Sequence, residues 1–127
     1  MLSVIIPAYN EDLSIERAYY TISDILNKEN IENEIIFIDD GSSDATYKVI
    51  KQLSDKEKNV IGLHFSRNFG KEAGLYAGLQ HAKGEYISLI DADLQQRPEI
   101  VRDMVAILDE DKDVDVVAAY QDRRRES

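Results

Sequence analysis

The chain has 127 residues, 43% of them hydrophobic and 31% charged, which is the composition of an ordinary soluble domain with a single core. Its formal net charge of −10 argues against nonspecific binding to nucleic-acid backbones or anionic membrane surfaces. The absence of cysteine excludes disulfides, thiolate metal sites and cysteine nucleophiles, and it fits a cytoplasmic location. No secretory leader is visible, and no apolar run approaches the roughly 20 residues that a membrane-spanning helix needs.

The first half of the chain alternates between predicted strands and helices. Residues 2–8 form an apolar run that predicts a buried strand, ended by its proline because proline cannot donate to a sheet ladder. Apolar side chains at helical spacing predict a helix over about 13–27. The run 34–38 predicts a second strand that leads directly into Asp39-Asp40-Gly41-Ser42-Ser43. The glycine there permits a tight turn, and either serine can cap the next helix, which runs to about residue 56.

The second half continues the alternation. The predicted strands cover residues 60–65, 86–90 and 114–119, and the predicted helices cover residues 71–82 and about 98–108. Gly70, Gly74 and Gly78 share one face of the third helix, which favours close packing of that helix on the sheet. We expect the strand over 86–90 to be the central one.

Such alternation predicts an α/β fold, with a mostly parallel sheet, helices on both faces and right-handed crossovers. Every strand–helix loop then lies at the edge formed by the carboxyl ends of the strands, where ligands bind in such sheets. The polar side chains collected at this edge are Asn10, Glu11, Asp39, Asp40, Arg67, Asn68, Lys71, Asp91, Asp93 and Gln95.

The strand over 86–90 ends in Asp91-Ala92-Asp93, two carboxylates separated by one alanine. Neighbouring carboxylates repel, so they need a cation, a proton or a donor between them. Mg²⁺ often bridges one or two carboxylates to the phosphates of a substrate. This pattern favours a metal–diphosphate site, although a solvated acidic turn after a core strand is an open alternative.

Two other charged positions also allow two interpretations each. Asp39 and Asp40 could bind a ribose or a base edge, or they could stabilise the amino end of the next helix. Lys71 begins a predicted helix, where the helix dipole disfavours a cation. Its position therefore indicates either an anionic ligand or an ion pair with Glu72 or Glu85.

The sequence lacks the motifs of several enzyme classes, which argues against those classes. The sequence contains neither G-x-x-x-x-G-K-[ST] nor G-x-G-x-x-G, the phosphate loops of ATPases and dinucleotide enzymes. We interpret His64 and His81 as structural. A receiver-type signalling domain has a similar length and alternation, but its acids should follow the first and third strands, with a lysine after the fifth.

Four segments, in this order, resemble the N-terminal half of the family 2 glycosyltransferases with the GT-A fold. They are Val4–Glu11, Phe37–Asp44, Phe65–Ala73 and Asp91–Gln95. The last two resemble the subgroup that glycosylates polyprenyl phosphates, which includes dolichol-phosphate mannose synthases and bactoprenol glucosyltransferases. The resemblance implies that residues 1–127 form one domain, the Rossmann-like nucleotide-sugar-binding half of a GT-A fold.

The resemblance also implies a role for each matching residue. Asp93 would be the catalytic carboxylate, and it would hold Mg²⁺ or Mn²⁺ together with Asp91 and Gln95. Asp39 would contact the base, while Lys71 and an arginine of the run 123–125 would contact the phosphates. The full set implied to bind the donor is Pro7, Ala8, Tyr9, Glu11, Asp39, Asp40, Lys71, Asp91, Ala92 and Arg123.

The implied activity is transfer of a sugar from a UDP- or GDP-linked donor to an acceptor, a polyprenyl phosphate in cell-envelope glycan synthesis. The acceptor-side half of the family is absent after Ser127. We therefore expect a donor-binding part of a longer protein, at the cytoplasmic face of the membrane, whose lipid-phosphate acceptor binds through the missing part. We expect no nucleic-acid partner, and exposed apolar surface could drive homo-oligomers. The alternatives are a noncatalytic nucleotide-sugar-binding module and the receiver-type domain.

Overall fold

The computed structural model describes residues 1–93 and 116–118, and it contains an alternating α/β fold. The elements in chain order are β1 (Leu2–Ala8), α1 (Ile15–Lys28), β2 (Asn33–Asp39), α2 (Thr46–Lys56), β3 (Val60–His64), α3 (Lys71–His81), β4 (Tyr86–Leu89) and β5 (Val116–Ala118). All of these agree with the predicted elements to within a few residues. The predicted helix over 98–108 lies outside the described residues, as do Gln95 and Arg123.

The five strands form one parallel sheet in the order β3-β2-β1-β4-β5. The chain steps outward from β1 to β2 and β3, and then returns to place β4 on the other side of β1. The strand order therefore reverses between β1 and β4. In open α/β sheets, ligands bind outside the carboxyl ends of the strands at such a switch point.

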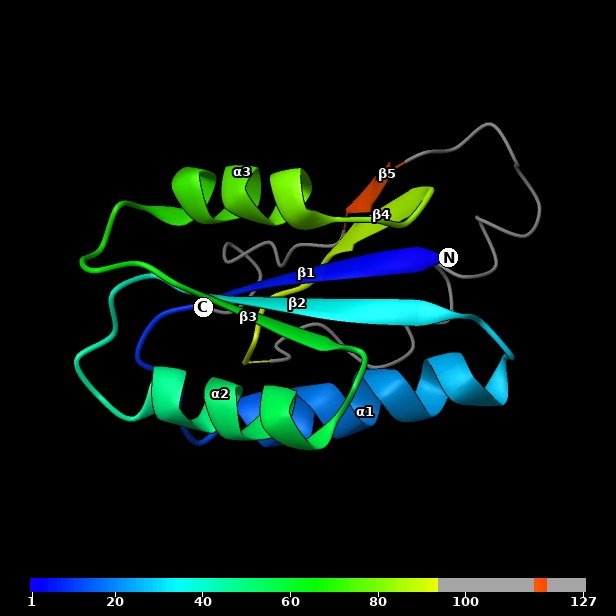
Figure 1. The fold of residues 1–127 in the computed structure, drawn as a ribbon, viewed down its shortest axis with the longest axis horizontal. Helices are drawn as coiled ribbons and strands as arrows, with labels where there is room; N and C mark the ends of the chain where they lie inside the picture. The colour runs from blue at the N-terminus through cyan, green and yellow to red at the C-terminus, as the bar shows by residue number, and fades with distance from the viewer. Residues whose placement is uncertain (94–115, 119–127) are drawn as a thin grey trace, which may run out of the picture.

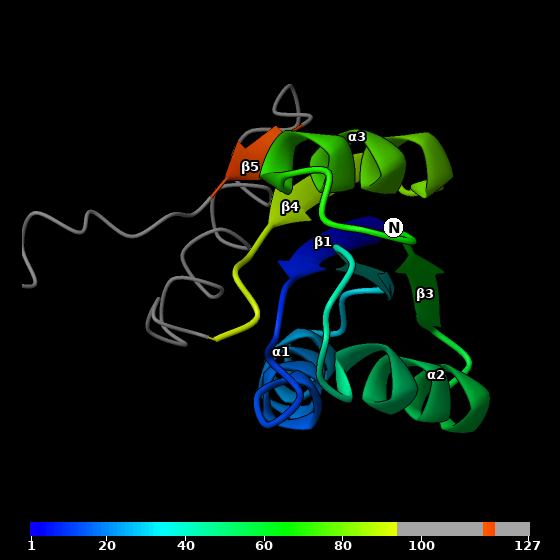
Figure 2. The ribbon, with the colours of Figure 1, turned by 90° about the vertical axis from the view of Figure 1, so that its left-hand side faces the viewer.

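The helices cover both faces of the sheet, as predicted. In Figure 2, which looks onto the carboxyl ends of the strands, α3 lies above the sheet and α1 and α2 lie below it. The side chains of β1 alternate between the two faces of the sheet. Val4 and Ile6 join the large core between the sheet and helices α1 and α2, and Ile5 joins the smaller core between the sheet and α3. A strand buried on both faces explains the continuous apolar run of the sequence.

The expectation that 86–90 is the central strand is wrong, because β1 occupies the middle of the sheet. The expectation that the proline ends the first strand is also wrong, since β1 continues to Ala8 and Pro7 pairs in register with Ile38 of β2. The carbonyl of Ala8 accepts from the Asp40 amide, so Pro7 presents its nitrogen toward β4 instead.

This orientation of Pro7 has a consequence for the site. The Ile90 amide donates to the Ile5 carbonyl at 3.1 Å. In a parallel ladder, the next bond would run from residue 7 to the carbonyl of Ile90, but proline has no N–H to donate. The β1–β4 ladder therefore ends here, and the two strands are free to diverge at the switch point.

The predicted capping and glycine packing are partly wrong. Neither Ser42 nor Ser43 caps α2, which begins at Thr46 with no side-chain cap on its N-cap residue. Gly74 and Gly78 do pack on the sheet, against Ile38 and Ile5. Gly70 precedes α3 with φ +98°, a conformation that other residues rarely adopt, and an added Cβ would meet nothing within 4 Å.

Candidate functional site

A hollow of about 150 Å³ lies at the switch point, beside the carboxyl end of β1. It is lined by the end of β1 and by the loops that follow β1, β2 and β4, together with the first residue of α3. The lining residues are Pro7, Ala8, Tyr9, Glu11, Asp40, Lys71, Asp91 and Asp93. Seven of the eight belong to the predicted donor-binding set, and Asp93 is the predicted catalytic and metal-binding acid, so the structure brings most of the predicted site residues together.

The β1–α1 loop is held by hydrogen bonds to the β2–α2 loop and to the first residue of α2. Asn10 has φ +52°, and its amide donates to the Ser42 hydroxyl at 2.9 Å. Its side-chain oxygen accepts from the Ser43 amide at 2.9 Å, and the Glu11 amide donates to the Thr46 hydroxyl at 2.8 Å. The two serines expected to cap a helix therefore fix the loop that presents Tyr9 and Glu11 to the hollow.

Asp40 holds the next loop along the edge. It is 6% exposed, and its two carboxylate oxygens accept from the amides of Phe69 (2.8 Å) and Gly70 (3.1 Å). These bonds fix the turn that leads directly into Lys71. Gly41 makes the close approach of the loops possible, because an added Cβ would lie 2.1 Å from the carbonyl carbon of Arg67.

Asp39 does not line the hollow, although the family resemblance implied that it would contact the nucleotide base. It is fully buried, with one oxygen 2.7 Å from Nδ1 of His64 and the other accepting from the Ser42 amide at 3.1 Å. The His64 ring stacks on Tyr47 with ring centroids 4.2 Å apart. Neighbouring residues at a strand end face opposite sides of the sheet, so Asp40, and not Asp39, turns to the hollow. This alternation is the signal in the sequence that could have separated the two acids.

Glu11 has an unusual electrostatic environment for a carboxylate. Burial, the nearby charge of Asp93 and the weaker effect of Asp91 raise its pKa to about 7, against the lowering effects of the Tyr9 backbone and Lys71. Its Oε2 atom is buried and has no hydrogen-bond partner among the described residues. Glu11 can therefore accept a hydrogen bond from a ligand, or bind a cation, that enters the hollow.

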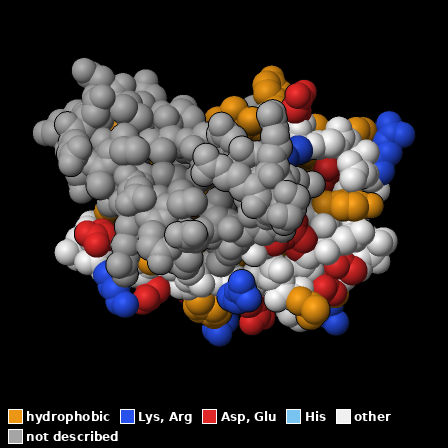
Figure 3. All heavy atoms as spheres, turned by 180° about the vertical axis from the view of Figure 1, so that it is seen from behind, with side chains coloured by type: hydrophobic (Ala, Val, Ile, Leu, Met, Phe, Trp, Pro, Cys, Tyr) orange, Lys and Arg blue, Asp and Glu red, His pale blue; other side chains and the backbone are white. Residues whose placement is uncertain are grey.

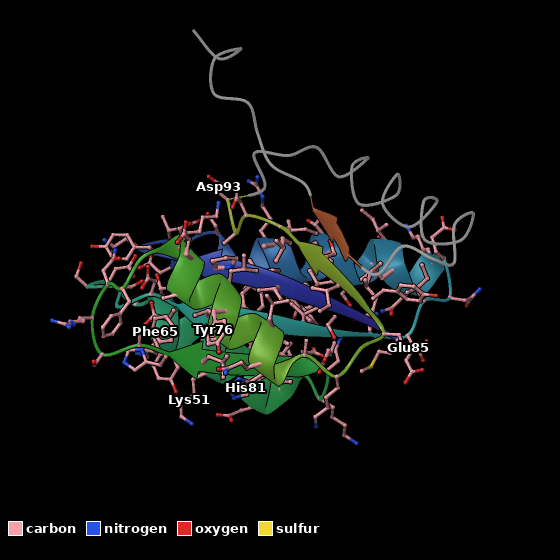
Figure 4. All side chains as sticks on the ribbon, turned by 90° about the horizontal axis from the view of Figure 1, so that it is seen from above. Lys51, Phe65, Tyr76, His81, Glu85 and Asp93 are labelled. Carbon is pink, nitrogen blue, oxygen red and sulfur yellow. The ribbon has the colours of Figure 1, made fainter. Side chains whose placement is uncertain are left out.

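Lys71 forms an ion pair with Asp91, with Nζ 2.7 Å from Oδ1. Of the two interpretations of Lys71, the ion pair with Glu72 or Glu85 is therefore wrong, and the anionic ligand stays a prediction. The start of α3 faces the end of β4 across the hollow, and this brings Lys71 to the first acid of Asp91-Ala92-Asp93. Figure 4 places Asp93 at this edge, and Figure 3 shows acidic side chains gathering on the side of the molecule where the strands end.

The hollow offers oxygen ligands of the kind that Mg²⁺ and Mn²⁺ take. Within residues 1–93 and 116–118, no three acidic or histidine side chains are grouped closely enough to hold a metal by themselves. Mg²⁺, however, is commonly bound by one or two carboxylates plus the phosphates of a substrate. The pair Asp91 and Asp93, with the unpartnered oxygen of Glu11 nearby, fits a metal that arrives with a diphosphate. Ala92 lies between the pair and is buried in the large core.

A parallel sheet with a hollow at its switch point places the chain among the α/β domains that bind ligands at the carboxyl ends of their strands. The chain belongs to glycosyl transferase family 2, whose family model matches residues 3–127. This confirms the predicted family and fold class, and with them the assignment to a family of transferases.

Known relatives and solved structures that are similar to this chain agree with this assignment. A prophage bactoprenol glucosyl transferase homolog of Escherichia coli K12 is 41% identical over 104 residues, which is 82% of this chain and 34% of the relative. The structure of a mannosyltransferase of Pyrobaculum calidifontis with GDP-Man and Mn²⁺ has a TM-score of 0.67 at 26% identity, covering 84% of this chain and 32% of that one. S. aureus TarS with UDP-GlcNAc has a TM-score of 0.64 at 27% identity, covering 86% and 31%.

The chain thus spans about a third of the length of the curated relatives it matches. No helix within the described part of the chain is long and apolar enough to cross a membrane.

Proposed function

We propose that this chain is the donor-binding part of a glycosyltransferase that transfers a sugar from a UDP- or GDP-linked donor to a polyprenyl phosphate, with a divalent metal. The observation that carries the proposal is the convergence of Asp40, Asp91, Asp93 and Lys71 on one hollow at the switch point of the sheet. These residues come from two separate loops and a helix start, and a merely solvated edge does not require them to meet.

The nucleotide is the part of the donor that this chain binds. The rim residue Tyr9 is 45% exposed and offers an aromatic face to a base. The deeper Asp40 accepts hydrogen bonds, and its carboxylate has lone pairs beyond those used by the Phe69 and Gly70 amides. We assign the base to this side of the hollow and the diphosphate to the side formed by Lys71, Asp91 and Asp93.

The diphosphate leaves during the reaction, and its growing negative charge has to be stabilised. Asp91 and Asp93 would hold the divalent metal there, and Gln95 remains a predicted third ligand. When bound, such a metal acts as a Lewis acid on the phosphoryl oxygens, an effect worth several kcal/mol. Lys71 adds a second positive charge at the same place.

The acceptor assignment depends on the relatives, because bactoprenol glucosyl transferases are among them. A lipid phosphate is already an anion, so it needs little help from a general base. The cytoplasmic location, the position of the parent protein at the membrane face and any homo-oligomer remain predictions.

A noncatalytic nucleotide-sugar-binding module is the second candidate, and the donor hollow fits it equally well. The receiver-type domain fits poorly. Its strand order is typically 2-1-3-4-5, whereas this sheet has the order 3-2-1-4-5. In addition, β3 ends in His64 and not in an acid.

Calorimetric titration with UDP-glucose, UDP-GlcNAc and GDP-mannose, each with Mn²⁺ or with EDTA, tests the proposal. We expect one nucleotide to bind with Mn²⁺ and to lose most of its affinity with EDTA or in Asp93→Asn. Asp55→Asn, an exposed acid on α2, is the matched control. Binding that ignores the metal would remove the metal role of Asp93, and absence of binding to any donor would contradict the proposed donor site. Sugar transfer to a polyprenyl phosphate by the full-length protein then separates the enzyme from the noncatalytic module.

A further inference from the structure

The backbone position of Lys71 is fixed by hydrogen bonds in the preceding turn. Asp40 accepts from the Phe69 and Gly70 amides, and Gly70 turns the chain with φ +98° so that Lys71 becomes the first residue of α3. A cation is disfavoured at this end of a helix, because the helix dipole places partial positive charge there. Something beyond the helix must therefore favour a lysine at this position.

The charge of the hollow provides a reason. Among the described residues that line it there are four acids, Glu11, Asp40, Asp91 and Asp93, and a single basic residue, Lys71. The Lys71 ammonium lies 2.7 Å from Asp91, the first acid of the pair assigned to the metal and the diphosphate. Lys71 also lowers the pKa of Glu11, so its charge reaches more than one acid of the hollow.

The ion pair between Lys71 and Asp91 is exposed enough to break when a ligand binds. Its side chain is 68% exposed, against 30% for that of Asp91. Exposed ion pairs are weak, and lysine carries its charge on a flexible four-carbon stem. A divalent cation on Asp91 would repel the ammonium, while a diphosphate would attract it.

We propose that Lys71 is a placeholder cation, which neutralises Asp91 while the donor site is empty and moves to the diphosphate when the donor and its metal bind. This inference rests on the proposed donor site. It assigns to one lysine two opposite effects, because the ammonium competes with a metal that binds alone and assists a metal that binds with nucleotide.

Lys71→Met tests the inference, since methionine keeps the length of the stem and removes the charge. Free Mn²⁺ measured by electron paramagnetic resonance gives the affinity for the metal alone, and calorimetry with Mn²⁺ and UDP gives the affinity for the nucleotide. We expect Mn²⁺ alone to bind about twofold to fivefold more tightly to Lys71→Met, the gain set by the loss of a weak ion pair. We expect UDP with Mn²⁺ to bind about tenfold more weakly, because a charge-assisted contact to phosphate is lost.

Two controls keep the result specific. Lys51→Met removes an exposed lysine from α2, which lies away from Asp93 in Figure 4, and should change neither affinity. In an Asp91→Asn background, Lys71→Met should no longer tighten Mn²⁺ binding, because the competing pair is already absent.

The outcomes separate this inference from the proposed function. If Lys71→Met leaves Mn²⁺ binding unchanged or weakens it, or if neither protein binds Mn²⁺ alone, the placeholder role is wrong, even where UDP binds as proposed. If the wild-type chain binds no UDP, the proposed function fails, while tighter Mn²⁺ binding by Lys71→Met would still establish the competition for Asp91.

Discussion

At the scale of single residues, Glu11 is a half-buried acid whose ionisation opposes folding. Its pKa is about 7 in the folded chain, against 4.5 for an ordinary glutamate, with burial as the largest cause and Asp93 next. Between these two values the folded chain keeps a proton that the unfolded chain has lost. Stability is therefore fully present below about pH 4.5 and falls as the pH rises through 7.

Glu11→Gln should remove this loss. We expect the variant and the wild type to be equally stable below the lower pKa. Above pH 7 the variant should be more stable, by on the order of 1–2 kcal/mol after allowance for partial solvent exposure. Urea unfolding of both proteins across this pH range measures the difference. A constant difference at every pH would contradict the raised pKa.

Thr46 carries the second prediction at this scale. Its side chain is fully buried, and its hydroxyl accepts from the Glu11 amide and donates to Asp44. Thr46→Val keeps the shape but leaves the amide and the carboxylate without this partner, which should cost about 1–3 kcal/mol of stability. Because the loop that carries Tyr9 and Glu11 loosens, nucleotide binding should weaken as well.

Thr46→Ser is the matched control, since it retains the hydroxyl. Unfolding curves and calorimetry with UDP and Mn²⁺ should place it near the wild type in both measurements. If the serine and valine variants lose nucleotide affinity equally, the hydrogen bond is not what positions the loop.

At the scale of elements, α3 lies close to the sheet because two of its residues have no side chain. An added Cβ at Gly78 would lie 2.6 Å from Ile5, whereas one at Gly74 would lie 3.6 Å from Ile38, an ordinary contact. Gly78→Ala should therefore destabilise the fold by about 1–3 kcal/mol through overpacking.

Gly74→Ala is the natural comparison, one helical turn away on the same face. It should be neutral or stabilising by up to about 1 kcal/mol, because alanine favours the helix over glycine. Thermal unfolding of the two variants decides the matter. Equal effects at both positions would mean that α3 shifts away from the sheet as a unit.

The elements were predictable because local and global signals agree in most of the chain. The run Ile35–Ile38 is apolar because β2 is covered on both faces, so its strand could be recognised without knowledge of its neighbours. The extension of β1 through Pro7 was not predictable in this way, because it depends on which neighbouring strand its nitrogen faces. The order of the strands could likewise not be predicted from local sequence patterns. The ion pair between Lys71 and Asp91, 20 positions apart, depends on that order and was therefore not predicted either.

At the scale of the whole molecule, the site is assembled from loops that the sheet alone brings together. Nucleotide and metal that bind only the folded chain should raise its stability by mass action. At a ligand concentration about 100 times the dissociation constant, the gain is about 2.7 kcal/mol. We expect UDP with Mn²⁺ to raise the midpoint of thermal unfolding, and Mn²⁺ or UDP alone to raise it much less.

Asp93→Asn should abolish most of this combined shift, while Asp55→Asn should retain it. The comparison works because neither substitution is expected to disturb the core, so that the unliganded midpoints provide a check on folding. A shift that persists in Asp93→Asn would place the metal elsewhere at the strand ends. A shift that disappears in both variants would mean that net charge, and not a built site, governs binding. Electrostatics favours the loss of the shift in Asp93→Asn. A diphosphate and the carboxylates of Asp91 and Asp93 are all negatively charged, so the diphosphate cannot approach them without a cation between.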